Sequence, residues 1–326
     1  MLWMASLIGL MAMGGMIIGD DADIEGGDDN AGDDGALTGP IEPETGTALP
    51  DLLPTGGSQG DDILSGTADS DSLAGGDGID QINGYGGDDL LDGGSDDDHL
   101  YGGEGADTIL GGDGSDLMHG EAGDDQMIGG NGSDSLFGHF GADLIIGGDG
   151  DDMAHGGQDG DTLLGGGGND ALHGNYGDDT LFGGDGADTL FGGVGDDLVS
   201  GADDAGERDY LNGGDGDDTL VAGANDVLTL GDGADQIITG SWITAGDSIE
   251  IIDFDAAEDQ LVLLWDLQDQ PDPDIQIESD PDAPDQSIIR INGTETLRLN
   301  SSAGITAADI VVLDQNSSAL AAHMPG

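Results

Sequence analysis

A nine-residue phrase is repeated sixteen times without a gap between residues 57 and 200, and this regularity constrains the fold more than any other feature. The first slot is Gly and the sixth slot is Asp in every copy. The eighth slot is Leu, Ile, Met or Val in every copy but one, where Ala154 stands. One such phrase cannot bury its single apolar side chain alone, whereas stacked copies can. A fixed short period of this kind predicts a solenoid.

The slots of the phrase differ in their expected backbone conformation. Slots seven to nine alternate polar, apolar and polar, which predicts a very short strand with slot eight inward and slots seven and nine outward. The five Gly- and Asp-rich slots before the sixth predict a turn. Slot four is Gly in thirteen copies and Asp in three (Asp69, Asp96 and Asp159). Because Asp is among the few residues besides Gly that tolerate a positive φ, slot four is expected to be left-handed.

The Asp of slot six is expected to recur along two edges of such a solenoid. Every second repeat places it on the same edge, with carboxylates ~5 Å apart at the spacing of neighbouring strands. Carboxylates at that distance repel each other strongly unless cations lie between them. Oxygen ligands alone, including backbone carbonyls exposed in Gly-rich turns, suit a hard ion such as calcium.

The phrase resembles G-G-x-G-x-D-x-U-x, the calcium-binding nonapeptide of the RTX (repeats-in-toxin, haemolysin-type) family. Residues 75–83, 102–110 and 183–191 match every fixed slot, and the resemblance extends from residue 57 to about residue 238. It implies an all-β fold, a right-handed parallel β-roll with two repeats per turn. It also implies several calcium ions between the loops of repeats n and n+2, held by loop carbonyls and slot-six Asp side chains. The alternative, a disordered acidic Gly-rich tract, is expected to describe the calcium-free chain.

The candidate calcium ligands are the slot-six Asp residues and their equivalents in the later, less regular copies. They are Asp62, Asp71, Asp80, Asp89, Asp98, Asp107, Asp116, Asp125, Asp134, Asp143, Asp152, Asp161, Asp170, Asp179, Asp188, Asp197, Asp209, Asp218 and Asp235.

The charge of the chain makes cation binding a condition of folding. There are 71 acidic residues against three Arg and no Lys, which gives a formal charge of −68. A charge of this size opposes compaction. It excludes nucleic acid as a partner, because phosphate binding needs clustered basic residues, and it disfavours anionic membrane surfaces. With no Cys, the chain has no disulfides, so calcium is expected to supply that stabilisation.

Four segments are expected along the chain. Residues 1–19 are hydrophobic and predict a membrane anchor, a cleaved signal or a hydrophobic start without function. Residues 20–56 are acidic and rich in Pro and Gly, which is typical of a flexible linker. The β-roll is expected over 57–240. Residues 241–326 predict a small C-terminal β cap and a region compatible with a secretion signal.

The later copies lose the strict phase, as is usual near the end of a solenoid. Three extra residues around Glu207–Arg208 are expected to bulge out as a loop. Beyond them, residues 252–262 resemble the segment that often follows RTX repeats in type I secretion substrates. Alternating aliphatic residues predict cap strands, interrupted by a Pro- and Asp-rich loop over 270–285. The expected strands cover 248–254, 260–265, 288–292, 295–299 and 310–313.

Five of the six histidines are tied to the phase of the repeat. His119, His155 and His173 occupy slot nine, His99 slot seven and His139 slot two, all outward or loop positions. No His-Glu-x-x-His motif is present, and the Gly-x-Ser-x-Gly match at residues 56–60 falls at the start of the first repeat rather than at a strand-to-helix elbow. We therefore expect the histidines to be surface residues and the chain not to be an enzyme.

Slot nine carries a second period of eighteen residues. Even repeats present Leu110, Ile128, Ile146, Leu164 and Phe182, whereas odd repeats present Tyr101, His119, Phe137, His155, His173 and Phe191. These sets predict an aliphatic ladder on one sheet and an aromatic and imidazole ladder on the other. Each could be local ladder packing or a contact strip.

The sequence favours a calcium-binding exported bacterial protein, extracellular or on the cell surface, that folds on calcium outside the cell and has a structural or adhesive role. A second hypothesis is a non-catalytic carrier or targeting module for a separately encoded secreted enzyme, and a third is calcium buffering alone. A cell-surface or extracellular protein or glycan is a candidate partner. Membrane contact is expected only through residues 1–19.

Overall fold

The computed structural model describes residues 55–202, 206–240, 242–243, 247–267, 273–283, 286–301 and 305–314. All regular structure in these ranges is β, and none of it is a helix that could cross a membrane. The expected anchor or signal over 1–19, the linker up to residue 54 and the end of the secretion-signal region fall outside the described residues.

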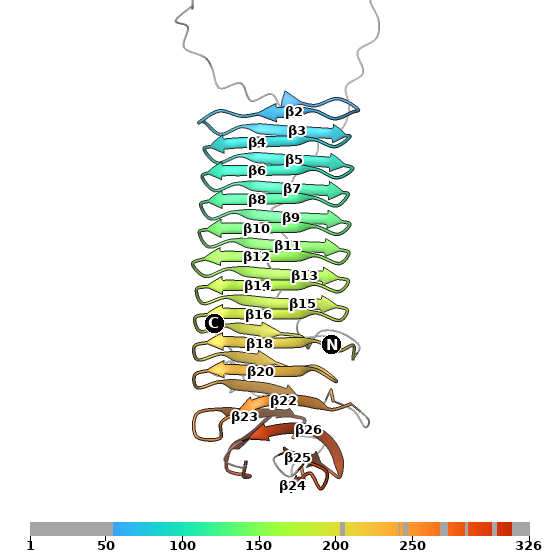
Figure 1. Ribbon diagram of the computed structural model, residues 1–326, viewed down its shortest axis with the longest axis vertical. Coiled ribbons are helices and arrows are strands. Elements are labelled where there is room, and N and C mark those ends of the chain that lie inside the picture. The colour runs from blue at the N-terminus through green and yellow to red at the C-terminus, as the bar shows by residue number, and fades with distance from the viewer. Residues whose placement is uncertain are drawn as a thin grey trace, which may run out of the picture. The chain divides into compact units, whose positions relative to one another are not determined.

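The strands form two sheets (Figure 1). The first sheet, in spatial order, contains β1 (Thr55–Gly56), β3 (Ser72–Asp77), β5 (Leu90–Ser95), β7 (Thr108–Asp113), β9 (Gln126–Asn131), β11 (Leu144–Asp149), β13 (Thr162–Gly167), β15 (Thr180–Asp185), β17 (Leu198–Ser200), β19 (Thr219–Val221), β21 (Gln236–Gly240), β23 (Gln260–Trp265) and β27 (Ile310–Asp314). The second contains β2 (Ile63–Ser65), β4 (Gln81–Gly86), β6 (His99–Glu104), β8 (Leu117–Ala122), β10 (Ser135–Phe140), β12 (Met153–Gln158), β14 (Ala171–Tyr176), β16 (Thr189–Val194), β18 (Tyr210–Asp215), β20 (Val227–Asp232), β22 (Ile249–Phe254), β26 (Thr294–Ser301), β25 (Gln286–Ile291) and β24 (Ile275–Ser279).

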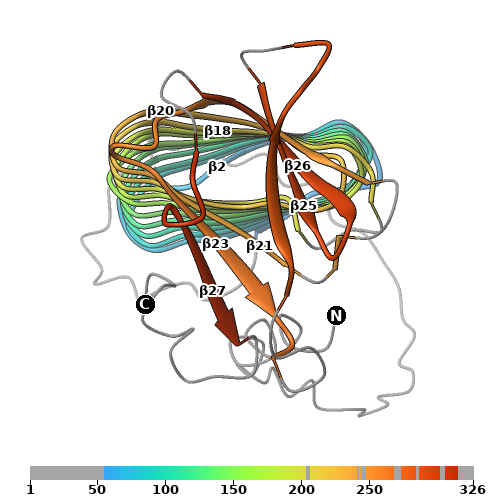
Figure 2. The ribbon, with the colours of Figure 1, turned by 90° about the horizontal axis from the view of Figure 1, so that it is seen from below.

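Successive strands of the repeat region alternate between the two sheets, so two nonapeptides complete one turn. Within a sheet the strands are parallel, and residues eighteen apart face each other, as Leu136 faces Ala154. Seen along its length, the coil is a flattened ring between two facing sheets (Figure 2). The predicted parallel β-roll with two repeats per turn is confirmed.

The strands are longer than the sequence predicted. Each full strand has six residues, made of slots seven to nine of one copy and slots one to three of the next, as in β10. The turn is therefore limited to slots four to six. Slots eight and one both face inward, because side chains alternate along a strand. The prediction treated the Gly slots as turn because their composition is turn-like, but parallel pairing carries the strand through them.

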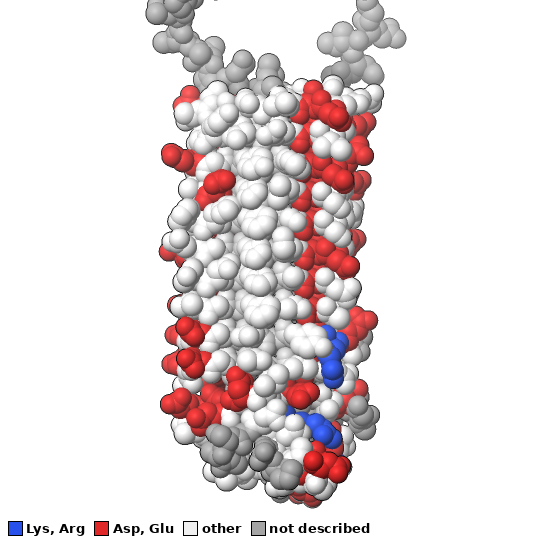
Figure 3. All heavy atoms as spheres, viewed as in Figure 1, with Lys and Arg blue, Asp and Glu red and all other residues white. Residues whose placement is uncertain are grey.

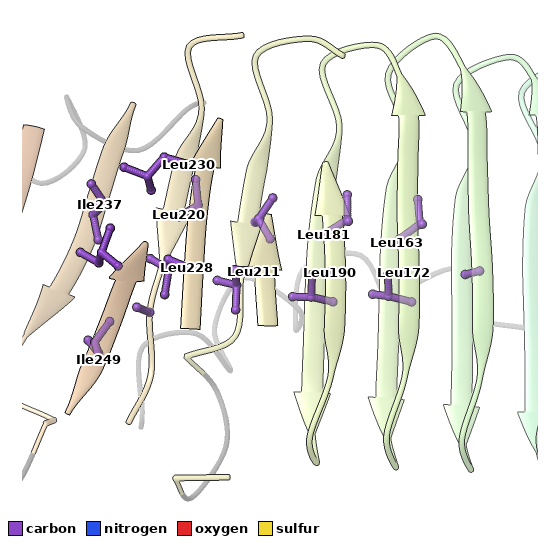
Figure 4. Close-up of a cluster of buried hydrophobic side chains, with 14 of the residues drawn as sticks. Leu163, Leu172, Leu181, Leu190, Leu211, Leu220, Leu228, Leu230, Ile237 and Ile249 are labelled. Atoms are coloured by element: carbon purple, nitrogen blue, oxygen red, sulfur yellow. The ribbon is translucent and has the colours of Figure 1, made fainter. Parts of the chain in front are cut away.

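The core is a line of slot-eight side chains from both sheets. Leu163, Leu172, Leu181 and Leu190 come from four successive strands and point into the same interior (Figure 4). Each is fully buried, and burial of such a side chain contributes roughly 1.5–3 kcal/mol. The predicted inward orientation of slot eight is confirmed, including the exceptional Ala154.

Slot four has the predicted left-handed backbone. Asp96 and Asp159 have φ values of 77° and 72°, and the Gly residues of this slot are also positive from Gly78 to Gly195. Gly60 and Asp69, in the first two copies, are exceptions. Slot two is left-handed as well in most copies, which the sequence reading missed. That slot is usually Gly, but it carries Tyr85, Glu121, His139 and Asn175 with φ from 73° to 81°.

The strands after the repeats continue both sheets. β22 pairs with β20, and β23 pairs with β21, both in parallel. β24, β25 and β26 then pair antiparallel. β24 lies inside the range 270–285 that was expected to be a loop, and that expectation was wrong for Ile275–Ser279. Its alternating Ile275 and Ile277 pack on the core despite the flanking Pro and Asp residues.

Candidate metal centres

Two columns of aspartates run along the length of the roll. The first contains Asp62, Asp80, Asp98, Asp116, Asp134, Asp152, Asp170, Asp188, Asp209 and Asp226. The second contains Asp71, Asp89, Asp107, Asp125, Asp143, Asp161, Asp179, Asp197, Asp218, Asp235 and Asp259. All nineteen candidate ligands lie in these columns, whereas Asp226 and Asp259 were not among them.

From Asp80 and Asp89 onward, one carboxylate oxygen of each Asp links neighbouring turns. The backbone N–H of Asp116 donates to Oδ1 of Asp134 at 2.8 Å, and the N–H of Asp134 donates in the same way to Asp152. The link survives the three-residue insertion, because the N–H of Asp197 still donates to Oδ1 of Asp218 at 2.8 Å. The inserted residues therefore leave the column in register.

The other oxygen occupies the space above the Gly of slot one. A Cβ added at Gly129 would lie against Oδ2 of Asp134, and one added at Gly147 would lie against Oδ2 of Asp152. Because slot one faces inward, any side chain there would displace the carboxylate. This steric requirement explains why slot one is Gly in all sixteen copies, which the sequence reading recorded without a cause.

In the interior of the columns this second oxygen is buried without a hydrogen-bond donor. The residues concerned are Asp80, Asp89, Asp98, Asp107, Asp116, Asp125, Asp134, Asp143, Asp152, Asp161, Asp170, Asp179, Asp197, Asp218 and Asp235. A buried polar group left unpaired costs roughly 1–3 kcal/mol, and more when it is charged. A row of such oxygens marks places for positively charged partners.

Burial also changes the acidity of these carboxyls. Burial, reinforced by the charges of neighbouring aspartates, raises the pKa of Asp161 and of Asp197 to about 8. The same causes raise the pKa of Asp98 and of Asp125 to about 7. Backbone donation to the carboxylates acts in the opposite direction but is the weaker effect. Without a cation, the folded roll therefore favours the protonated form of Asp161 and Asp197 at neutral pH.

The ends of both columns are arranged differently. At the start, Oδ2 of Asp62 accepts from the N–H and hydroxyl of Ser58, and Oδ2 of Asp71 accepts from those of Thr67. At the other end, Oδ2 of Asp226 accepts from the N–H of Gly223, and Oδ2 of Asp259 from that of Asp255. Asp226 was visible in the sequence as the Asp of a shortened copy. Asp259 could be placed only by the pairing of β21 with β23.

The outer faces of the sheets carry the two predicted ladders. Ile128, Ile146 and Leu164 are register partners on the first sheet, which confirms the aliphatic ladder. On the second sheet the rings of Tyr101, His119, Phe137, His155, His173 and Phe191 are stacked with centroids 4.7–5.2 Å apart. Slot nine thus points outward as predicted, although the three ladder histidines are half-buried between their neighbours.

The donor set of the columns fits a hard divalent cation. The unpaired Oδ2 atoms are carboxylate oxygens, and the adjacent turns add backbone carbonyls, further acidic side chains and, in a few copies, the oxygen of a Ser or Asn side chain. Calcium takes six to eight oxygen ligands in flexible geometry, which such a set can supply. The ligand role of each individual Asp remains a prediction.

Comparison with known families agrees with this chemistry. The model of the RTX calcium-binding nonapeptide repeat, built from four copies, matches residues 56–91, 65–100, 92–127, 101–136, 128–163, 164–199, 203–225 and 222–241. A search of the curated proteins found no match to the chain. The matched segments cover more than half of the sequence and coincide with the aspartate columns. The chain therefore belongs to the family of RTX calcium-binding repeat proteins.

Proposed function

We propose that this protein is exported from a bacterial cell, folds outside it on binding calcium, and has a structural or adhesive role at the cell surface or beyond. Calcium binding follows from the family. Export, the site of folding and the role are the steps that we add.

The row of buried, unpaired Oδ2 atoms is the observation that carries the proposal. The Asp residues of both columns, together with carbonyls of the turns, would hold the ions. Bound calcium would supply positive charge where neighbouring carboxylates repel each other. Binding energy then becomes folding energy, because the oxygens are brought together only when the turns stack.

The charge of the chain favours a role outside the cell. With a formal charge of −68 and few basic residues, the calcium-free chain repels itself and resists compaction. Extracellular calcium modules bind at roughly 10⁻⁴–10⁻³ M, well above the range of cytosolic sensors. An unfolded chain can pass a secretion channel and then fold where calcium is abundant.

The surface of the roll favours a structural or adhesive role over catalysis. In Figure 3 an uncharged strip runs along the middle of the visible face, with acidic side chains gathered at its edge. The aliphatic and aromatic ladders repeat the same outward chemistry along the length of each sheet. Such a periodic surface suits an extended contact. The alternative is a carrier or targeting module for a separately encoded secreted enzyme, which the same surface could serve.

A calcium titration followed by far-ultraviolet circular dichroism tests the folding step. We expect a cooperative gain of β signal at millimolar calcium and none at equal magnesium. Magnesium keeps several waters and demands near-octahedral geometry, which the turns cannot easily complete. A chain equally ordered in chelator and in calcium would contradict the proposal.

Substitutions in the aliphatic ladder test the proposed structural or adhesive role. Replacement of Ile128, Ile146 and Leu164 by Thr keeps β-branched strand residues while removing much of the apolar surface. We expect this variant to fold on calcium but to lose binding to the surface of the producing cells. Unchanged cell binding would show that the ladder is only local packing. An activity screen with the co-secreted proteins, with and without this chain, tests the carrier alternative.

A further inference from the structure

A second group of metal-ligand side chains lies on the outer face of the second sheet, on the side opposite to the inward-facing aspartates. His119 Nδ1 lies 2.9 Å from His139 Nε2. A carboxylate oxygen of Glu121 and one nitrogen of each ring all lie within 4.8 Å of one another. Among the residues that the structure describes, this is the single cluster of three such donors.

The register of β8 and β10 brings the three side chains together. Glu121 on β8 is the direct partner of His139 on β10. His119 precedes Glu121 by two residues and therefore points to the same face of the sheet. Neighbouring strands place the donors of slots nine and two side by side, so the cluster needs no rearrangement of the backbone.

Two of the three residues occupy a position where the repeat normally has Gly. Slot two of the flanking strands β6 and β12 is Gly103 with φ 119° and Gly157 with φ 133°, whereas Glu121 has φ 80° and His139 has φ 79°. A left-handed backbone is disfavoured for residues that carry a Cβ. Observed strain of this kind is concentrated at functional sites.

Glu121 and His139 are also the only pair of non-Gly slot-two residues with a positive φ that lie on consecutive turns of the described roll. The interior slot-two residues other than Gly are Tyr85, Glu121, His139 and Asn175. Tyr85 pairs with Gly103, and Asn175 pairs with Gly157 and Gly193. Glu121 and His139 pair with each other, beside the imidazole of His119. An isolated surface substitution does not account for this coincidence.

We propose that His119, Glu121 and His139 form a binding site for a divalent transition-metal ion of the zinc type, separate from the calcium columns. Two imidazoles and one carboxylate are a common zinc donor set, whereas calcium prefers oxygen ligands alone. In a tetrahedral site with Zn–N bonds near 2.0–2.1 Å, the two nitrogens would lie about 3.3 Å apart. The observed 2.9 Å therefore requires only a small rotation of the rings.

One side of the cluster is open to solvent. Glu121 also lines a shallow hollow with Tyr85, Tyr101 and Glu104. An ion can enter from this side, and a water molecule can complete its coordination there. The other histidine pair of the ladder provides a contrast, because His155 and His173 stack at 4.7 Å but have Gly157 and Asn175 in slot two, with no carboxylate.

The test uses the full chain in excess calcium, where the roll is folded and the weak acidic sites are occupied. Cobalt(II) is titrated as a spectroscopic probe and then displaced by zinc. We expect one ion per chain, visible d–d absorption, and affinity at least tenfold tighter than in variants that lack a donor. Zinc should also raise the unfolding temperature of the wild-type chain.

Each donor can be removed with a residue that the roll already uses at the same slot. His119→Phe keeps a stacked ring in the ladder, while Glu121→Gly and His139→Gly restore the usual slot-two residue. All three should fold on calcium as the wild type does, yet lose the tight cobalt site and the thermal shift by zinc. If His119→Phe folds poorly, the two Gly variants decide the question.

The matched controls are His173→Phe and Asn175→Gly, which make the same kinds of change at the donor-poor histidine pair. They should leave cobalt affinity and spectrum unchanged. The proposal is overturned if the wild type binds cobalt no more tightly than His139→Gly. It is also overturned if the spectrum survives in the Glu121 and His139 variants or disappears in the two controls.

Discussion

The interior and the ends of the aspartate columns use the same residue in the same slot, yet they satisfy it differently. In mid-roll, Asp134 links two turns through Oδ1 and leaves Oδ2 buried without a donor. At the start of the second column, Oδ2 of Asp71 accepts from both the N–H and the hydroxyl of Thr67. At the far end, Asp259 is satisfied by the N–H of Asp255. At the ends, Oδ2 is hydrogen-bonded by a residue of the same turn, whereas in the interior it is available to a cation.

This difference shows how the aspartate columns of the roll are terminated. A terminal Asp has a neighbouring turn on one side only, so it cannot share an ion in the way an interior Asp can. Ser58 and Thr67 stand in slot two of the first two copies, where the interior usually has Gly. Their hydroxyls supply the donors that the missing turn cannot. Calcium dependence should therefore reside in the interior.

The largest expected effect is the pH dependence of the calcium-free chain. Burial raises the pKa of interior carboxyls, to about 8 for Asp161 and Asp197, above their ordinary value in the unfolded chain. The folded roll thus binds more protons, and its free energy of unfolding falls as pH rises. That stability should be present near pH 4 and lost through pH 6 to 8.

In chelator, we expect β ellipticity to increase when the pH is lowered from 8 to 4. In saturating calcium the dependence should reverse, because protons then compete with the ion for the carboxylates. High salt at pH 8 serves as the control, since it screens exposed charges but not buried ones. Equal ellipticity in chelator at pH 4 and pH 8 would show that the buried carboxyls do not govern folding.

The next largest effect is the difference in the calcium midpoint of folding between Asp134→Ala in the interior and Asp62→Ala at the end. The interior variant loses a cation ligand and also leaves the N–H of Asp116 without its acceptor, which alone costs roughly 1–3 kcal/mol. The end variant loses only contacts with Ser58. The calcium midpoint of folding should rise several-fold for Asp134→Ala and little for Asp62→Ala. Equal midpoints would argue against ions shared between turns.

A smaller difference in thermal stability is expected between two Gly→Ala substitutions in slot four, one at Gly132 in mid-roll and one at Gly60 in the first copy. Gly132 has φ 126°, and a Cβ there would lie against the carbonyl oxygen of Gly114. Gly60, in slot four of the first copy, has no atom near its added Cβ. The strained backbone alone costs roughly 1–2 kcal/mol at Gly132. Thermal unfolding in calcium should show a clear loss for Gly132→Ala and almost none for Gly60→Ala.

The smallest effect concerns the donors at the start. Thr67→Ala removes the hydroxyl that donates to Asp71 at 3.0 Å but keeps the backbone donor at 2.6 Å. Because one ordinary hydrogen bond is worth about 0.5–1.5 kcal/mol, a decrease of that order is expected. Hydrogen exchange localised to the first turns provides the measurement, with the variant Ser65→Ala as control. Loss of protection in mid-roll would mean that the end and the interior are not distinct.

Most of the structure of the roll could be predicted from the sequence, because every copy has the same pattern of Gly, Asp and aliphatic residues. The inward residue of slot eight and both outer ladders followed from periodicity, and the left-handed slot four followed from its restriction to Gly and Asp. Asp259 did not, because it is 24 residues from Asp235 and joins the column only through the pairing of β21 and β23. β24 was missed for a related reason, since its Ile residues are framed by Pro and Asp.

By itself the sequence determined the repeat, the inward core and the recurring rows of acids, since each depends on a local pattern repeated in phase, and its resemblance to the RTX nonapeptide implied the turn of two copies. Only the tertiary structure decided how each carboxylate is used. One oxygen ties turns eighteen residues apart, and the other fills the space left by the slot-one Gly. The structure also joined Glu121 to two histidines on adjoining strands. These arrangements depend on distances between residues far apart in the chain, and such distances are fixed only when the turns stack.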